Sequence, residues 1–137
     1  MGGRGAKAGV GSSAVARKLQ TAKKNNQFPN AIAGDPKQQQ DVLKAINNVY
    51  DYPADLKSYM SSEYRQGTKK VQIGKPQTDD RNAAREYVMI RAGNSTLRAS
   101  YVPGASAKET AAIRDGAVKF ALINWWRKQG NKLSFNE

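Results

Sequence analysis

The sequence contains no cysteine and no histidine. Disulfides and thiolate chemistry are therefore excluded, and a zinc site would lack its two most common ligand types. The side chain that most often acts as general acid or base is also missing. We accordingly predict that the protein is not an enzyme, with no catalytic residue, no metal site and no cofactor.

Long apolar runs are missing as well. No stretch approaches the length that spans a bilayer, and the first residues lack the apolar centre of a secretory signal. We therefore expect a soluble cytoplasmic protein, in the host cytoplasm if a phage encodes it. Neither a membrane nor a small-molecule substrate is expected as a partner, and the oligomeric state stays open.

Acidic residues are scarce, with 11 Asp and Glu against 23 Lys and Arg and a net charge of +12 over 137 residues. Residues 1–34 hold six cations and no acid, and residues 68–137 hold thirteen cations and six acids, whereas residues 35–67 are nearly neutral. This asymmetry favours a polyanionic partner, most often nucleic acid, over a merely soluble basic protein.

We divide the chain into a basic flexible arm, residues 1–34, and a compact α+β domain, residues 35–137. The first eleven residues include five glycines and cannot pack a core. A short amphipathic helix, Ala14 to about Lys24, is expected in the arm, with Val15 and Leu19 on its apolar face. Such a helix can dock on the body or contact nucleic acid.

A hairpin of two strands, Glu86–Ala92 and Ser95–Val102, is the clearest element. Gly93 followed by Asn94 suits a type II′ turn. Pairing outward from this turn gives one apolar face and one face studded with arginine. The expected pairs are Ala92 with Ser95, Ile90 with Leu97, Val88 with Ala99 and Glu86 with Tyr101, then on the other face Arg91 with Thr96, Met89 with Arg98 and Tyr87 with Ser100.

The last helix is expected to begin at a capping box, Ser106 with Glu109, and to end at Gly130. It is apolar on more than one side, so we expect the sheet to cover one side and a second helix the other. Partial exposure of its aromatic end is the alternative.

Two further helices, Asp35 to Tyr50 and about Pro53 to Gln66, are predicted to form a helical hairpin. Lys69–Ile73 alternates and is predicted to be an edge strand, with Val71 and Ile73 inward. Asp79–Arg85 is predicted to make a helical turn. The fold class is therefore α+β: a three-stranded antiparallel sheet packed on a long C-terminal helix, preceded by the helical hairpin and the basic arm.

The order helix, three strands, helix from Pro53 onward resembles the double-stranded-RNA-binding domain. Gly104-Ala-Ser-Ala-Lys-Glu109 resembles the Gly-x-Ser-Lys-Lys-Glu motif that opens the family's last helix, and Ala121-Leu122 resembles its Ala-Leu pair. That family grips phosphates with the lysines at this helix start, which implies Lys108 here, because Ala107 replaces the neighbouring lysine. Similar sheets occur in DNA-binding arms of phage integrases, so RNA and DNA both stay open.

The leader Met1-Gly-Gly-Arg-Gly5 resembles the start of small accessory proteins encoded by phages and mobile elements. This resemblance implies an alternative function, inhibition of a host defence nuclease of the RNA-guided type by binding a nucleoprotein. Trp125 and Trp126 would then be candidate protein-interface residues, since tryptophan is enriched in interface hot spots.

The main hypothesis is a small basic phage-encoded protein that contacts the phosphate backbone of RNA or DNA. Sequence specificity and protein partners are not visible in the pattern. The candidate phosphate contacts are Arg4, Lys7, Arg17, Lys18, Lys23 and Lys24 on the arm, and Lys69, Lys70, Lys75, Arg81, Arg85, Arg91, Arg98 and Lys108 on the body.

Overall fold

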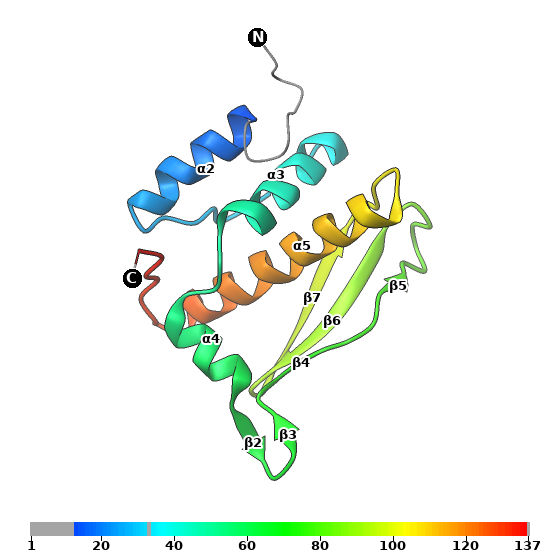
Figure 1. The fold of residues 1–137 in the computed structure, drawn as a ribbon. Coiled ribbons are helices and arrows are strands. Elements are labelled where there is room, and N and C mark those ends of the chain that lie inside the picture. The colour runs from blue at the N-terminus through cyan, green and yellow to red at the C-terminus, as the bar shows by residue number, and fades with distance from the viewer. Residues whose placement is uncertain (1–12, 33, 137) are drawn as a thin grey trace.

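The structure, a computed structural model, describes residues 13–32 and 34–136. It is an α+β fold in which α3 lies between α2 and α5, and α5 lies between α3 and the sheet (Figure 1). The elements, in chain order, are α2 (Ala14–Lys24), α3 (Pro36–Val49), α4 (Ala54–Ser61), β2 (Glu63–Arg65), β3 (Thr68–Lys69), β4 (Val71–Ile73), β5 (Gln77–Thr78), β6 (Glu86–Ala92), β7 (Ser95–Tyr101) and α5 (Ala107–Lys128).

The β6–β7 hairpin has the predicted register at all seven pairs, from Ala92 with Ser95 to Glu86 with Tyr101. Gly93 has φ +59°, and among the described non-glycine residues only Asn26 has a positive φ, so the loop has the signature of a type II′ turn. Alternate side chains on the face toward α5 are buried. Hydrophobic patterning and one turn thus determine this part of the sheet.

The first strand position of the sheet is broken into two short pieces. Both β4 and β5 pair antiparallel with β6, β4 near the hairpin turn and β5 near the start of β6. Gly74 bridges them, its N–H donating to the carbonyl of Met89 at 2.9 Å. The sheet therefore has three strand positions, as predicted, with an interrupted edge. Val71 is buried as expected, but Ile73 is 50% exposed because it lies at this open edge.

Helix α5 is covered on two sides, as predicted, by the sheet and by α3. Its Lys119 reaches the end of α3, where the ammonium group donates to the carbonyls of Asn47 (3.2 Å) and Tyr50 (2.7 Å). Burial lowers the pKa of Lys119. A cation from one helix thus satisfies the free carbonyl groups at the C-terminus of the other.

The described part of the predicted arm packs on the body, which corrects the expectation of a flexible segment there. Helix α2 lies on α3 with Leu19 buried, and Phe28 is buried in an aromatic cluster with Tyr50 and Phe135. The Tyr50 hydroxyl also donates to the carbonyl of Gln27 at 2.7 Å. The cluster unites three distant segments of the chain, so no local pattern could reveal it.

The third predicted helix is too long, because α4 ends at Ser61 instead of near Gln66. The next residues form the β2–β3 hairpin, which turns at Gly67 with φ +76°. A glycine with positive φ serves equally as a helix stop or a hairpin turn, which explains the error.

The predicted helical turn at Asp79–Arg85 is also wrong. These residues form the loop between β5 and β6, closed by the N–H of Asp79 on the carbonyl of Arg85 at 3.0 Å.

Candidate nucleic-acid interface

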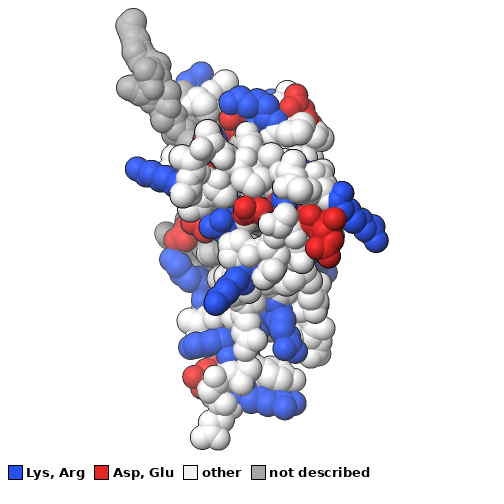
Figure 2. Space-filling model, turned by 90° about the vertical axis from the view of Figure 1, so that its right-hand side faces the viewer, with Lys and Arg blue, Asp and Glu red and all other residues white. Residues whose placement is uncertain are grey.

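The outer face of the sheet, which carries Met89, Arg91, Thr96 and Arg98, is exposed. Helices α3 and α5 lie on the opposite face (Figure 1). Figure 2 shows one side of the molecule, where Lys and Arg gather at the lower end, over the β2–β3 hairpin and the neighbouring corner of the sheet. Some acidic surface is also visible among them, and the upper part of the same view mixes both signs of charge more evenly.

A hollow of about 360 Å³ lies between the β2–β3 hairpin and the turn end of the sheet. We call it the hairpin hollow. Its lining includes four cations and no carboxylate: Arg65, Lys69, Lys70 and Arg91, with the ring of Tyr64 beside them. Among the described residues none of these four cations forms a salt bridge. The hollow is therefore a cationic site with no carboxylate in its lining, although Glu63 lies opposite Lys69 on the paired strand.

Two backbone hydrogen bonds attach the hairpin to the sheet at this hollow. The N–H of Lys70 donates to the carbonyl of Ser62, and the N–H of Gly93 donates to the carbonyl of Lys70, each at 3.0 Å. Lys70 also holds its ammonium 5.0 Å from the centroid of the Tyr59 ring. These contacts place Lys69 and Lys70 next to Arg91, although about twenty residues separate them in the chain.

Arg65 and Tyr64 were missed as site residues because the helix was predicted to continue through them. The pairing of β2 with β3 shifts by one residue between Glu63 and Arg65, which is a bulge. A bulge breaks strict alternation, so both Tyr64 and Arg65 can line the hollow. Tyr64 follows Tyr59 and Met60 at helical spacing, so the sequence predicted a helix at these positions and not a hairpin.

A second group of predicted cations, Arg81, Arg85 and Arg98, lies at the far end of the outer face. Arg98 forms a salt bridge with Asp79 at 3.2 Å, and its guanidinium lies 3.7 Å from the centroid of the Tyr87 ring. The backbone N–H of Arg81, and Arg98 beside it, hold the pKa of Asp79 below its usual value. These contacts leave Arg98 less available to an added anion.

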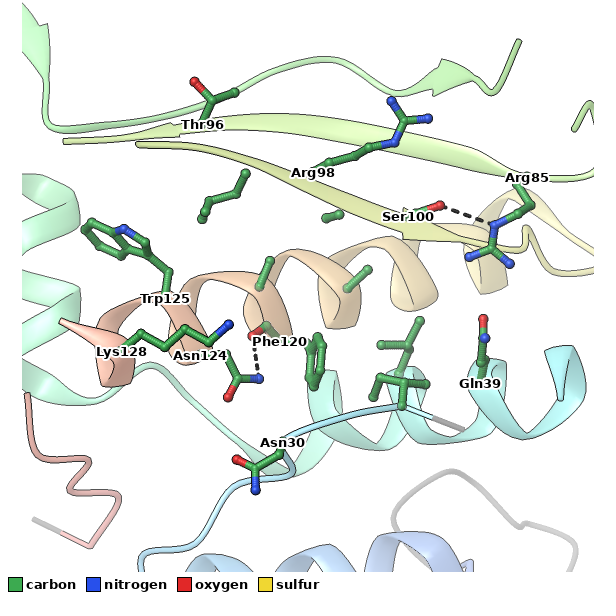
Figure 3. Close-up of a pocket in the computed structure, with 16 residues that line it drawn as sticks. Asn30, Gln39, Arg85, Thr96, Arg98, Ser100, Phe120, Asn124, Trp125 and Lys128 are labelled. Carbon is green, nitrogen blue, oxygen red and sulfur yellow. Dashed lines mark hydrogen bonds between the residues drawn. The ribbon is translucent and has the colours of Figure 1, made fainter. Parts of the chain in front are cut away.

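Arg85 at the same end donates from Nε to the Ser100 hydroxyl at 3.2 Å. It borders a second hollow of about 560 Å³ between β7, α5 and residues 30–32 (Figure 3). Arg98 and Lys128 also line this hollow, but Leu97, Phe120 and Trp125 give it a large apolar surface, and Arg98 is paired with Asp79. It is therefore less suited to phosphate than the hairpin hollow.

The remaining predicted cations lie elsewhere. Arg17, Lys18, Lys23 and Lys24 belong to α2, with α3 and α5 between them and the sheet (Figure 1). Lys75 is exposed in the break between β4 and β5. Lys108 is in the first turn of α5, about 25 Å along the helix from Trp125. Arg4 and Lys7 lie outside the described residues.

Trp125 and Trp126 are half-buried instead of projecting as anchors. Their ring centroids lie 5.8 and 5.3 Å from that of Tyr59. Both indole nitrogens are buried and have no acceptor among the described side chains and backbone. A role in binding a protein stays a prediction.

Within the described ranges no group of three or more acidic residues is placed to hold a metal ion. No helix in that part of the chain is long and apolar enough to cross a membrane.

Comparisons with protein families, curated proteins and solved structures found no match. The function is therefore argued from the residues and their geometry.

Proposed function

We propose that the protein binds the phosphate backbone of nucleic acid at the hairpin hollow. The observation that carries the proposal is the cluster of Arg65, Lys69, Lys70 and Arg91 around one hollow without a carboxylate. Like charges brought together repel, so a cluster of cations without a salt bridge favours an anion that enters it. Guanidinium groups bind phosphate through two hydrogen bonds, and ammonium groups bind it as point charges.

The net charge of +12 supports a polyanion over a single small anion. Cations outside the hollow add a long-range attraction that raises the association rate and falls with ionic strength. Phosphate contacts of this kind position a nucleic acid without reading its sequence. We accordingly assign backbone binding to the hollow and no base-specific readout.

The test is a salt titration of binding to a labelled oligonucleotide. One variant carries Lys69→Gln, Lys70→Gln and Arg91→Gln, and the matched control carries Lys18→Gln, Lys23→Gln and Lys24→Gln on α2. Both lose three charges. The hollow variant should weaken binding at least tenfold and flatten the plot of log affinity against log salt by about 0.7 to 0.9 per lost contact.

The α2 control should have the smaller effect on both quantities. If the two variants weaken binding equally, only net charge matters and the hollow is not the site. If neither naked RNA nor naked DNA binds the wild type, the phosphate-binding proposal fails, and the alternative of a nucleoprotein partner gains support.

A further inference from the structure

Tyr64 is the most exposed large apolar side chain in the described part of the chain, at 53%. It belongs to a short hairpin that projects from the body at the lower end of Figure 1. Its ring is not part of the hydrophobic core. A single exposed ring is common on protein surfaces, but this one lies at the edge of a cationic hollow, where a ligand can reach both the ring and the cations.

The other tyrosines of the described chain have partners that account for them. Tyr50, Tyr52 and Tyr59 belong to or pack against the core, and Tyr101 is fully buried. Tyr87 is covered by the Arg98 guanidinium at 3.7 Å. The Arg65 guanidinium lies over the Tyr64 ring at the longer distance of 5.3 Å from its centroid, so it covers that ring less closely. The Tyr64 ring is thus the one best placed to accept a flat ligand.

The ring and the cations belong to one site. The bulge between Glu63 and Arg65 lets consecutive side chains, Tyr64 and Arg65, line the same hollow, together with Lys69. The neighbouring groups of a nucleotide chain are a flat base and a charged phosphate. A ring next to a cationic hollow matches that alternation.

We infer that the ligand of the hairpin hollow is single-stranded nucleic acid, with one base stacked on Tyr64 and an adjacent phosphate in the hollow. The inference rests on the proposed phosphate binding and adds the class of ligand. In a duplex each base face is covered by the neighbouring base pairs, so only an unpaired strand offers a free face. Stacking on an aromatic side chain tolerates every base, so little sequence preference is expected.

The experiment compares a labelled 15-nucleotide single strand, its duplex with the complement and a mononucleotide, for wild type, Tyr64→Ala and Tyr64→Phe. The wild type should bind the single strand at least tenfold more tightly than the duplex, and the mononucleotide at least a hundredfold more weakly than the strand. Tyr64→Ala should weaken single-strand binding about tenfold and leave duplex binding within twofold. Tyr64→Phe should retain the selectivity.

The outcomes separate this inference from the proposal beneath it. Equal affinity for strand and duplex, with both weakened by the Lys69, Lys70 and Arg91 substitutions, would overturn the single-strand inference and keep phosphate binding. Equal losses from Tyr64→Ala and Tyr64→Phe would assign the effect to the hydroxyl instead of stacking and overturn it too. A mononucleotide that binds as tightly as the strand would also overturn it. Absence of binding to both nucleic acids would overturn both proposals.

Discussion

Gly116 of α5 lies directly against the backbone of Leu43 in α3. A Cβ atom added at Gly116 would stand 1.9 Å from the Leu43 carbonyl oxygen and 2.6 Å from its carbonyl carbon. Neither atom belongs to a side chain that can rotate away. The two central helices therefore meet backbone to backbone at this point, and any larger residue must separate them.

Gly116→Ala should destabilise the fold by about 3 kcal/mol or more, because the helices must move apart and loosen the core on both sides. At an exposed helix position alanine is more favourable than glycine by about 1 kcal/mol. A loss of stability in Gly116→Ala would therefore show that the close contact outweighs this preference. Chemical denaturation measures the change. The control is Asp115→Ala on the exposed side of the same turn, expected to stay within about 0.5 kcal/mol. A stabilised Gly116→Ala protein would contradict the close contact.

Phe28→Ala should cost about 3 to 5 kcal/mol of unfolding free energy, because its ring is 5% exposed and packs edge-on against Tyr50 at 4.9 Å. Gln20→Ala, on the exposed side of α2, is the control and should be nearly neutral. Thermal or denaturant melts report both. A loss below about 1 kcal/mol for Phe28→Ala would restore the prediction that this part of the chain is an arm outside the fold.

Tyr50→Phe should change how stability depends on alkaline pH. Burial raises the pKa of Tyr50 to about 12. The folded state favours the neutral phenol, so this stabilisation is complete below pH 10 and is lost as pH rises from about 10 to about 12, by up to about 1.4 kcal/mol per pH unit.

At neutral pH the substitution should cost about 1 kcal/mol through the lost hydrogen bond to Gln27. Between pH 10 and 12 the wild-type advantage over Tyr50→Phe should shrink and then reverse. Denaturant melts at a series of pH values measure both proteins. Stability curves that stay parallel up to pH 12 would rule out a buried, un-ionised Tyr50 hydroxyl.

Hydrogen exchange along β7 should alternate. The two-residue turn makes Ala92 and Ser95 a hydrogen-bonded pair, so the N–H groups of Leu97, Ala99 and Tyr101 point to β6. Those of Thr96, Arg98 and Ser100 point to the free edge, and β7 pairs with β6 alone among the described strands. The first set should exchange slowly and the second fast, as measured residue by residue by NMR. Uniform protection would mean that another chain pairs with this edge.

The hairpin, α2, α3 and α5 could be predicted from the sequence because each is encoded locally. Ser13, Asp35 and Ser106 each cap their helix with a side-chain hydrogen bond, Ser106 as predicted. The candidate site was predicted only in part. Lys69, Lys70 and Arg91 were named from charge, but their meeting in one hollow depends on a register between distant strands.

The errors share a physical origin. The apolar spacing of Leu56, Tyr59 and Met60 continues to Tyr64 in helical phase, and nothing in that phase marks the end of the helix at Ser61. The expectation of a flexible arm is the second error. The buried face of α2 includes Ala16, and an alanine gives little indication in the sequence that its position is buried. Tertiary contacts decide both cases.

Helix α5 is the last element of the chain to be synthesised, and earlier segments depend on it for their contacts. Arg127, near its end, donates to the carbonyl of Phe28 at 3.1 Å, and Asn124 donates to that of Pro29 at 3.2 Å. Phe28, Pro29 and helix α3 are therefore synthesised well before α5, which packs against them, by an interval on the order of ten seconds at about 5 to 20 residues per second. Until then the face of α3 that packs on α5 is open to chaperones and proteases, and a chain terminated before α5 could not close its core.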